Sequence, residues 1–124
     1  MRSKQPIHWF EKRVAELLNP VTDTEVYVTG DRGTRNKDND LLFDIGDPHK
    51  QFCGFQVECK YRDIRNIMIS LEDWNHLSDQ ATENMRIPIL AFANRKAPNG
   101  LVVMDIHDFI FLLTELQSAW KRLK

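Results

Sequence analysis

The chain has 124 residues, of which 42% are hydrophobic and 28% are charged. This composition excludes a disordered tail, and the length fits one domain over residues 1–124. No apolar run approaches the roughly 20 residues that cross a bilayer, so we expect no membrane span. Seventeen basic and eighteen acidic side chains give a net charge of −1, which excludes a generally cationic nucleic-acid coat but allows a local basic track.

The first half of the chain reads as one helix followed by strands. Apolar residues recur at helical spacing until Asn19-Pro20, which ends the pattern. Short runs rich in β-branched and apolar residues follow, separated by a polar segment with two glycines. The predicted elements are a helix over 6–18, strands over 25–29, 41–45 and 52–61, and a loop over 30–39, with Gly46-Asp47-Pro48 ending the second strand.

The second half begins with a helix that Ser70 caps while Asp73 reaches back. Its predicted apolar face consists of Leu71, Trp74, Leu77, Ala81 and Met85. Strands over 89–93 and 101–106 and a helix over 108–123 complete the elements. The order α-β-β-β-α-β-β-α predicts an α/β fold in which helices flank a mixed sheet.

The strand over 52–61 alternates with period two, so its residues divide between two faces. Glu58 and Lys60 share one face with Gly54 and Gln56. The other face carries Cys53, Phe55, Val57, Cys59 and Tyr61. Taken alone, Glu58 and Lys60 fit a solvated ion pair on an amphipathic strand. The two cysteines are predicted to be core residues too close together to pair, which indicates a reducing, cytoplasmic setting.

Asp40 and Asp44 share one face of the preceding strand. If the two strands form a hairpin, either aspartate can approach Glu58. Carboxylates that approach one another repel unless a cation holds them, and hard oxygen ligands suit Mg²⁺ or Mn²⁺. The alternative is that both aspartates solvate the edge of a strand.

The first helix offers two further acids, and its periodicity separates them. At about 100° per residue from Ile7, the apolar stripe spans about 280° to 380°, Glu11 lies at about 40°, and Glu16 lies at about 180°. An acid beside the inward stripe costs free energy unless a cation or hydrogen bonds satisfy it. Glu11 is therefore the candidate site residue, and Glu16 is predicted to face solvent.

Together these features resemble the PD-(D/E)xK nuclease superfamily, and most closely its archaeal-type Holliday junction resolvases, which include phage-encoded members. The resemblance covers residues 7–106 and lies in the segments FEKRVAELL (10–18), DNDLL (38–42), QVECK (56–60) and IPILAF (87–92). Asn39 stands where the family has its motif proline. The resemblance implies a restriction-endonuclease-like sheet and a cytoplasmic protein, or one of the host cytoplasm if it is phage-encoded.

The resemblance also implies the roles of the site residues. Glu11, Asp40, Glu58 and Lys60 match the catalytic set of the family, with Asp40 preferred to Asp44 because Asp-Leu-Leu follows the basic loop. Asp40, Glu58 and the main-chain carbonyl of Cys59 would hold one or two Mg²⁺ ions, for which Mn²⁺ would substitute. Lys60 would position or deprotonate the attacking water or neutralise charge on phosphorus, and Glu11 would bind metal through water or orient Lys60. The products would be a 5′-phosphate and a 3′-hydroxyl.

Basic residues before and after these motifs are candidates for binding the phosphates of DNA. Such contacts give affinity that is independent of sequence and sensitive to salt. The candidates are Arg32, Arg35 and Lys37 in the loop, then Arg62 and Arg65, with Lys4, Lys12 and Arg13 as possible additions. The alternative is an ordinary solvated loop and helix face.

The expected partners are branched DNA and a second copy of the chain. Paired cuts in a junction need two active sites related by a two-fold axis, and the apolar run 109–113 exceeds what one face of a surface helix needs. The four histidines lack metal-ligand spacing, and no glycine motif implies a nucleotide cofactor. The alternatives are a nicking, repair or restriction-like nuclease of the same superfamily, and a DNA-binding protein without catalysis.

Overall fold

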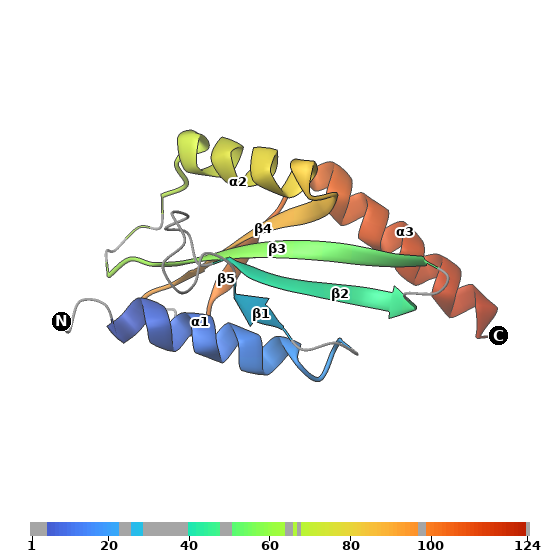
Figure 1. The fold of residues 1–124 in the computed structure, drawn as a ribbon, viewed down its shortest axis with the longest axis horizontal. Helices are drawn as coiled ribbons and strands as arrows, with labels where there is room; N and C mark the ends of the chain where they lie inside the picture. Colours follow the sequence, from blue (N-terminus) through green and yellow to red (C-terminus); the bar gives the residue numbers. More distant parts are fainter. Residues whose placement is uncertain are drawn as a thin grey trace.

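The computed structural model of the chain describes residues 5–22, 26–28, 40–47, 51–63, 66, 68–96 and 99–123. Its elements, in chain order, are α1 (Gln5–Leu18), β1 (Tyr27–Val28), β2 (Leu41–Asp47), β3 (Gln51–Tyr61), α2 (Leu71–Glu83), β4 (Arg86–Ala93), β5 (Leu101–Val103) and α3 (Ile106–Arg122) (Figure 1). Four strands have three residues or more in this described part, and they give the order α-β-β-α-β-β-α. The two-residue β1 adds one further strand before β2.

The strands form one mixed sheet in the order β1-β2-β3-β4-β5. Neighbouring strands are antiparallel except β3 and β4, which are parallel and joined by the crossover helix α2. The expected α/β fold class, with helices and a mixed sheet, is therefore confirmed. Among the described residues, no helix is long and apolar enough to cross a membrane.

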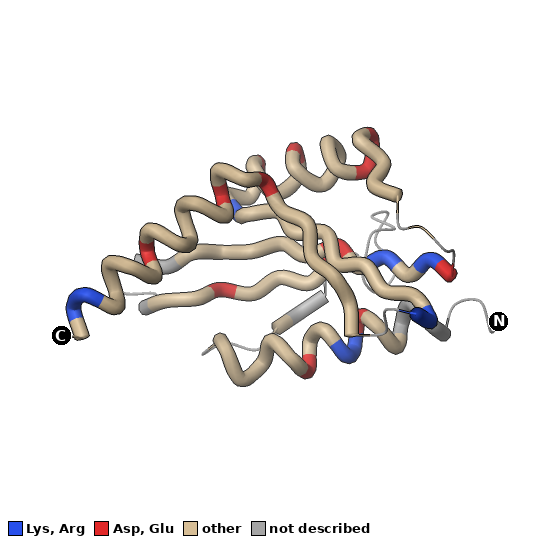
Figure 2. Tube along the Cα trace, turned by 180° about the vertical axis from the view of Figure 1, so that it is seen from behind, with Lys and Arg blue, Asp and Glu red and all other residues tan. Residues whose placement is uncertain are grey.

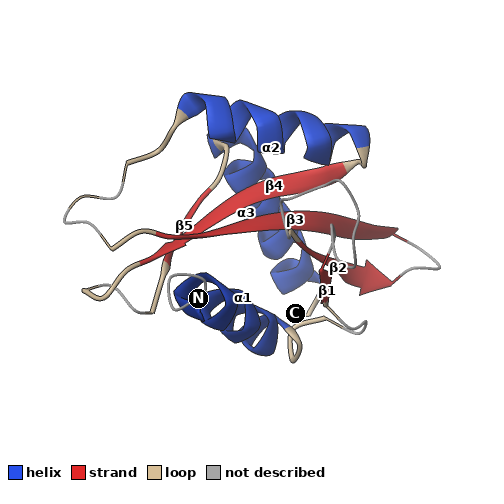
Figure 3. Cartoon of the chain, turned by 60° about the vertical axis from the view of Figure 1, so that its left-hand side comes forward, coloured by secondary structure: helices blue, strands red, loops and turns tan. Residues whose placement is uncertain are grey.

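Helices α1 and α2 cover opposite faces of this sheet (Figure 3). On the α1 side, buried Phe10 packs in one cluster with Phe43, Phe55 and Val57. On the α2 side, buried Leu77 packs with Leu90 and Phe92. The predicted period-two alternation of β3 is confirmed, because its apolar residues join the α1 cluster and its polar residues lie on the α2 side.

Several predicted strand ends are wrong by a few residues. β2 continues through Gly46, whose φ of 119° fits a glycine, to Asp47. β4 starts at Arg86 and includes Pro88. Proline is tolerated there because β5 pairs with only Leu90–Phe92, which leaves one side of β4 open at Pro88. β5 ends at Val103, since Asp105 caps the next helix by accepting a hydrogen bond from the His107 amide.

The predicted helix faces are correct only in part. In α2, Leu77 and Ala81 are buried and Trp74 is partly buried, but Leu71 is exposed. Met85 is 90% exposed because it lies beyond the end of α2, with a φ of 56°. Leu17 of α1 is also exposed, so the inward stripe of this helix is narrower than predicted.

Candidate active site

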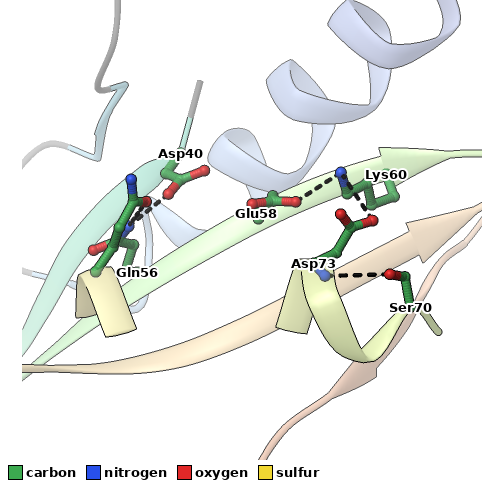
Figure 4. Close-up of polar contacts among 7 residues, drawn as sticks. Asp40, Gln56, Glu58, Lys60, Ser70 and Asp73 are labelled. Atoms are coloured by element: carbon green, nitrogen blue, oxygen red, sulfur yellow. Dashed lines mark hydrogen bonds and ion pairs between the residues drawn. The ribbon is translucent and has the colours of Figure 1, made fainter. Parts of the chain in front are cut away.

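The polar face of β3 forms the floor of the candidate site, opposite helix α2 (Figure 4). Glu58 is 6% exposed, and its Oε2 atom lies 2.8 Å from Nζ of Lys60. Because the two residues are separated by one position on a strand, both side chains project from the same face. The expected neighbourhood of Glu58 and Lys60 is confirmed, and their ion pair is largely buried rather than solvated.

Asp40 lies beside Glu58 because of the register between β2 and β3. The pairing of Leu41 with Val57 places the preceding residue, Asp40, across from Glu58. Asp40 is fully buried, and one of its oxygens, Oδ2, accepts a hydrogen bond from Nε2 of Gln56. The hairpin that the sequence predicts thus brings the two buried carboxylates of Asp40 and Glu58 together (Figure 4).

Asp44 lies farther along β2 and has a different partner. It pairs with Gly54 in the register, and its Oδ1 atom lies 3.1 Å from Nη1 of Arg86. The same guanidinium nitrogen donates hydrogen bonds to the main-chain oxygens of Phe43 and Phe55. Asp44 therefore belongs to an ion pair that links β2 and β4 across β3, and Asp40 is the aspartate next to Glu58.

Glu11 approaches from the opposite side of the sheet, on α1. It is partly buried, whereas Glu16 of the same helix is exposed, as the helical periodicity predicts. Cys59 points toward α1, and burial together with the charges of Glu11, Asp40 and Glu58 raises the pKa of its thiol to about 12. All three carboxylates therefore raise the pKa of one buried thiol, which projects from β3 toward α1.

Helix α2 contributes residues that sequence reasoning did not assign to the site. Oδ2 of Asp73 lies 3.9 Å from Nζ of Lys60, while the Asp73 amide donates to the Ser70 hydroxyl at 3.2 Å. Nε2 of Gln56 lies 3.5 Å from Oε1 of Gln80 and also donates a hydrogen bond to Oδ2 of Asp40. Gln56 has a signal in the sequence, because it shares the face of Glu58. Asp73 and Gln80 have none, since their approach depends on how α2 lies over β3.

A divalent cation such as Mg²⁺ needs several oxygen ligands close together. Among the described residues, no group of three or more His, Cys, Asp or Glu side chains could hold a metal ion. The site instead presents two neighbouring buried carboxylates, which are the oxygen ligands that Mg²⁺ prefers. Within the described part of the chain, the buried Oε1 of Gln56 has no hydrogen-bond partner and can accept from water or a ligand. These oxygens fit a magnesium ion that keeps several of its waters.

Most of the predicted phosphate-binding residues cannot be placed. Arg32, Arg35, Lys37, Arg65 and Lys4 lie outside the described residues. Arg62 is exposed directly after β3, and Lys12 and Arg13 are exposed on α1.

The structure adds Arg95 and Lys96 to the basic residues near Arg62. In Figure 2, blue Lys and Arg segments gather at the end of the sheet that lies toward the N-terminus. They follow β4, which ends beside β3 because the pairing of these parallel strands extends to Tyr61 and Ala93. Arg95 lies 2.8 Å from Asp63 in an exposed ion pair. Sequence reasoning missed Arg95 and Lys96 because their approach to Arg62 depends on the parallel pairing of β3 with β4. This pairing brings the ends of both strands to one edge of the sheet.

Comparison of the chain with protein-family models, with curated proteins and with solved structures gives no match.

Proposed function

We propose that the chain is a metal-dependent, structure-selective DNA endonuclease that resolves four-way (Holliday) junctions by paired phosphodiester hydrolysis. The observation that carries this proposal is the buried pair of Asp40 and Glu58, with Lys60 2.8 Å from Glu58. The resemblance of the surrounding motifs to Holliday junction resolvases supports the choice of substrate.

The electrostatics of the site favour a bound cation. Asp40 and Glu58 are neighbouring buried acids, and Glu11 and Asp73 bring further negative charge from α1 and α2. Lys60 supplies one positive charge to this group. Carboxylates that share a site repel one another, and a divalent cation between them offsets this repulsion.

Asp40, Glu58 and the main-chain carbonyl of Cys59 would hold Mg²⁺, or Mn²⁺ in its place. The bound ion supplies a Lewis acid that polarises the scissile phosphate and lowers the pKa of a water ligand. Lys60 would contact the attacking water or the phosphate, because its ammonium group lies next to Glu58. Asp73 orients that ammonium from α2, and Gln56 holds the Asp40 carboxylate through its hydrogen bond.

The proposal is tested by cleavage of three labelled DNAs: a four-way junction, a linear duplex of the same sequence and a single strand. Each is incubated with the protein in Mg²⁺, Mn²⁺ or EDTA. We expect paired cuts in the junction with either metal and no cuts in EDTA. Products that a ligase rejoins without further treatment would agree with 5′-phosphate and 3′-hydroxyl ends.

Other outcomes would overturn the proposal in different ways. Equal cleavage of the duplex and the junction would favour a nicking, repair or restriction-like nuclease. Junction binding without cleavage in any metal would favour a DNA-binding protein without catalysis.

A further inference from the structure

The connection from β4 to β5 ends in the pair Asn99-Gly100, and Asn99 is the one asparagine of the sequence that is followed by glycine. Asn99 is exposed in a turn, and Gly100 is partly buried directly before β5. Gly100 has a φ of 88°, which lies in the left-handed region that favours glycine. The pair therefore joins an accessible side-chain amide to a following residue that has no side chain.

An asparagine followed by glycine can react with its own main chain. The amide nitrogen of Gly100 attacks Cγ of Asn99 and forms a C–N bond, while the side-chain nitrogen leaves as ammonia and takes the proton of the Gly100 amide. The product is a succinimide ring, which water opens at either carbonyl to give aspartate or isoaspartate. The chain itself keeps the two reacting groups close together, so the reaction needs no partner other than water.

Asn84 provides a comparison within the same chain. It is also exposed and is also followed by a residue with a positive φ, Met85 at 56°. The side chain of Met85 hinders the attack, and the Met85 amide donates a hydrogen bond to the main-chain oxygen of Thr82 at 3.0 Å. By contrast, the Gly100 amide makes no main-chain hydrogen bond to another described residue. The two asparagines thus differ in how far the attacking nitrogen is held and shielded, and not in their exposure.

The surroundings of Gly100 give the reaction a consequence for the fold. A Cβ atom placed on Gly100 would lie 3.1 Å from the ring of Phe10 and 3.4 Å from the main-chain oxygen of Phe92. Phe10 is the buried residue of α1 in the core, and Phe92 pairs with Leu101, the residue after Gly100. Isoaspartate adds a carbon atom to the main chain directly before Gly100. The lengthened turn has little room beside Phe10, so we expect it to displace this ring.

We propose that Asn99-Gly100 is a self-modification site, at which the folded protein loses ammonia and converts Asn99 into isoaspartate and aspartate. The isoaspartate form loosens the packing of α1 on the sheet through Gly100 and Phe10. The aspartate form keeps the length of the main chain, and its charge stays in water because position 99 is exposed. The inference is independent of the proposed function, since the reaction needs neither a metal nor DNA.

The first test is peptide mass mapping of the folded full chain after incubation in EDTA at neutral and at alkaline pH. We expect the peptide with Asn99 to gain the mass of an NH₂-to-OH exchange and to accept methyl groups from an isoaspartate methyltransferase. The conversion should be faster at alkaline pH, because the amide nitrogen attacks after it loses its proton. Asn84 should stay intact, and so should the variant Asn99→Gln, whose longer side chain would have to close a larger ring. Intact Asn99 in the folded protein, or equal conversion of Asn84, would overturn the inference.

The second test measures the consequence for α1 in the same samples. We expect aged wild type to melt at a lower temperature than fresh wild type and to exchange the amide hydrogens of α1 faster. Asn99→Gln should keep both properties on ageing, and Asn99→Asp should resemble fresh wild type because it lacks the added main-chain atom. Unchanged melting and α1 exchange in wild type with converted Asn99 would overturn the effect on α1. Loosening of α1 in fresh Asn99→Asp would assign the effect to charge and contradict the role of the added atom.

Discussion

At the scale of single residues, the pKa of the Cys59 thiol reflects its burial and the negative charges of the site. Burial and the charges of Glu11, Asp40 and Glu58 raise its pKa to about 12 from the usual 9.0. The thiol therefore stays protonated in the folded protein at pH values where it ionises in the unfolded chain. Folding is stabilised by this difference at pH values below 9, and the stabilisation is lost as the pH rises through 12.

We therefore expect the unfolding free energy of the metal-free protein to fall between pH 9 and pH 12. Cys59→Ala should show a shallower fall, because the variant has no thiol to ionise. Urea unfolding in EDTA, at several pH values for both proteins, measures this difference. Parallel curves for the two proteins would contradict the raised pKa of Cys59 and thus its burial among these acids.

Glu11 and Glu16 provide a matched pair on one helix. Glu11 is partly buried on the side of the sheet, and Glu16 is exposed. Glu11→Gln should lower the rate of junction cleavage by orders of magnitude and cost little stability, because it removes an acid from beside other acids. Glu16→Gln should change the unfolding free energy by no more than about 0.5 kcal/mol and leave cleavage unchanged.

Single-turnover cleavage of a four-way junction and thermal melts of both variants test this pair. Equal activity of the two variants would remove Glu11 from the site and leave Asp40, Glu58 and Lys60. Loss of activity in Glu16→Gln alone would mean that α1 presents its other face to the site.

At the scale of elements, the end of α2 contains a residue in an unfavourable conformation. Met85 follows the C-cap residue Asn84 and has a φ of 56°, where side chains with a Cβ are strained. It is almost fully exposed, so the side chain gains little from packing. Glycine is the residue that this position favours.

Met85→Gly should stabilise the protein by about 0.5 to 1 kcal/mol, because relief of the backbone strain exceeds the added entropy of the unfolded chain. Met85→Ala is the control, since it removes the same exposed side chain but keeps the Cβ. Chemical denaturation of both variants measures the effect. A Met85→Gly protein no more stable than Met85→Ala would contradict this interpretation of the turn.

The elements also show what the sequence could predict about the site. Period-two alternation predicted the shared face of Glu58 and Lys60, and helical periodicity distinguished Glu11 from Glu16. Both are local patterns, which depend only on the geometry of one strand or one helix. The choice of Asp40 over Asp44 as the metal ligand needed the family resemblance and stays a prediction. The structure shows that Asp40 lies across from Glu58, whereas Asp44 pairs with Arg86.

Contacts between distant segments could not be predicted in this way. Arg86 lies 42 positions after Asp44 in the sequence, and it reaches that residue only because β4 runs parallel to β3. Asp73 has a local capping position, and nothing in its surroundings predicts an approach to Lys60. The strand at Pro88 was missed because proline is normally a signal against a strand, and here β4 is open on one side.

At the scale of the whole molecule, a net charge of −1 has to be reconciled with binding to DNA. Described basic residues gather at one edge of the sheet, where Lys60 and Arg62 at the end of β3 lie near Arg95 and Lys96 after β4. A divalent cation at Asp40 and Glu58 would add positive charge at the same edge. The local field, rather than the net charge, then attracts the phosphates.

We therefore expect a strict requirement for a divalent metal. Ca²⁺ should support binding of the junction without cleavage, because it neutralises the carboxylates but is larger and less demanding in its coordination geometry than Mg²⁺. Gel-shift and cleavage assays in Ca²⁺, Mg²⁺ and EDTA measure the two steps separately. Full cleavage activity in EDTA would exclude a metal from the reaction.

The most direct test of the proposed site compares Asp40→Asn and Glu58→Gln with Asp44→Asn in single-turnover cleavage of a four-way junction in Mg²⁺. Asp44 is the matched control, since it lies four residues after Asp40 on the same face of the hairpin but pairs with Arg86. All variants are assayed at a temperature where they are folded, and junction binding is measured in parallel. We predict that Asp40→Asn and Glu58→Gln bind the junction as well as the wild type, or more tightly, and do not cut it, whereas Asp44→Asn cuts it at close to the wild-type rate. Retained cleavage in Asp40→Asn, or loss of cleavage in Asp44→Asn alone, would contradict this account.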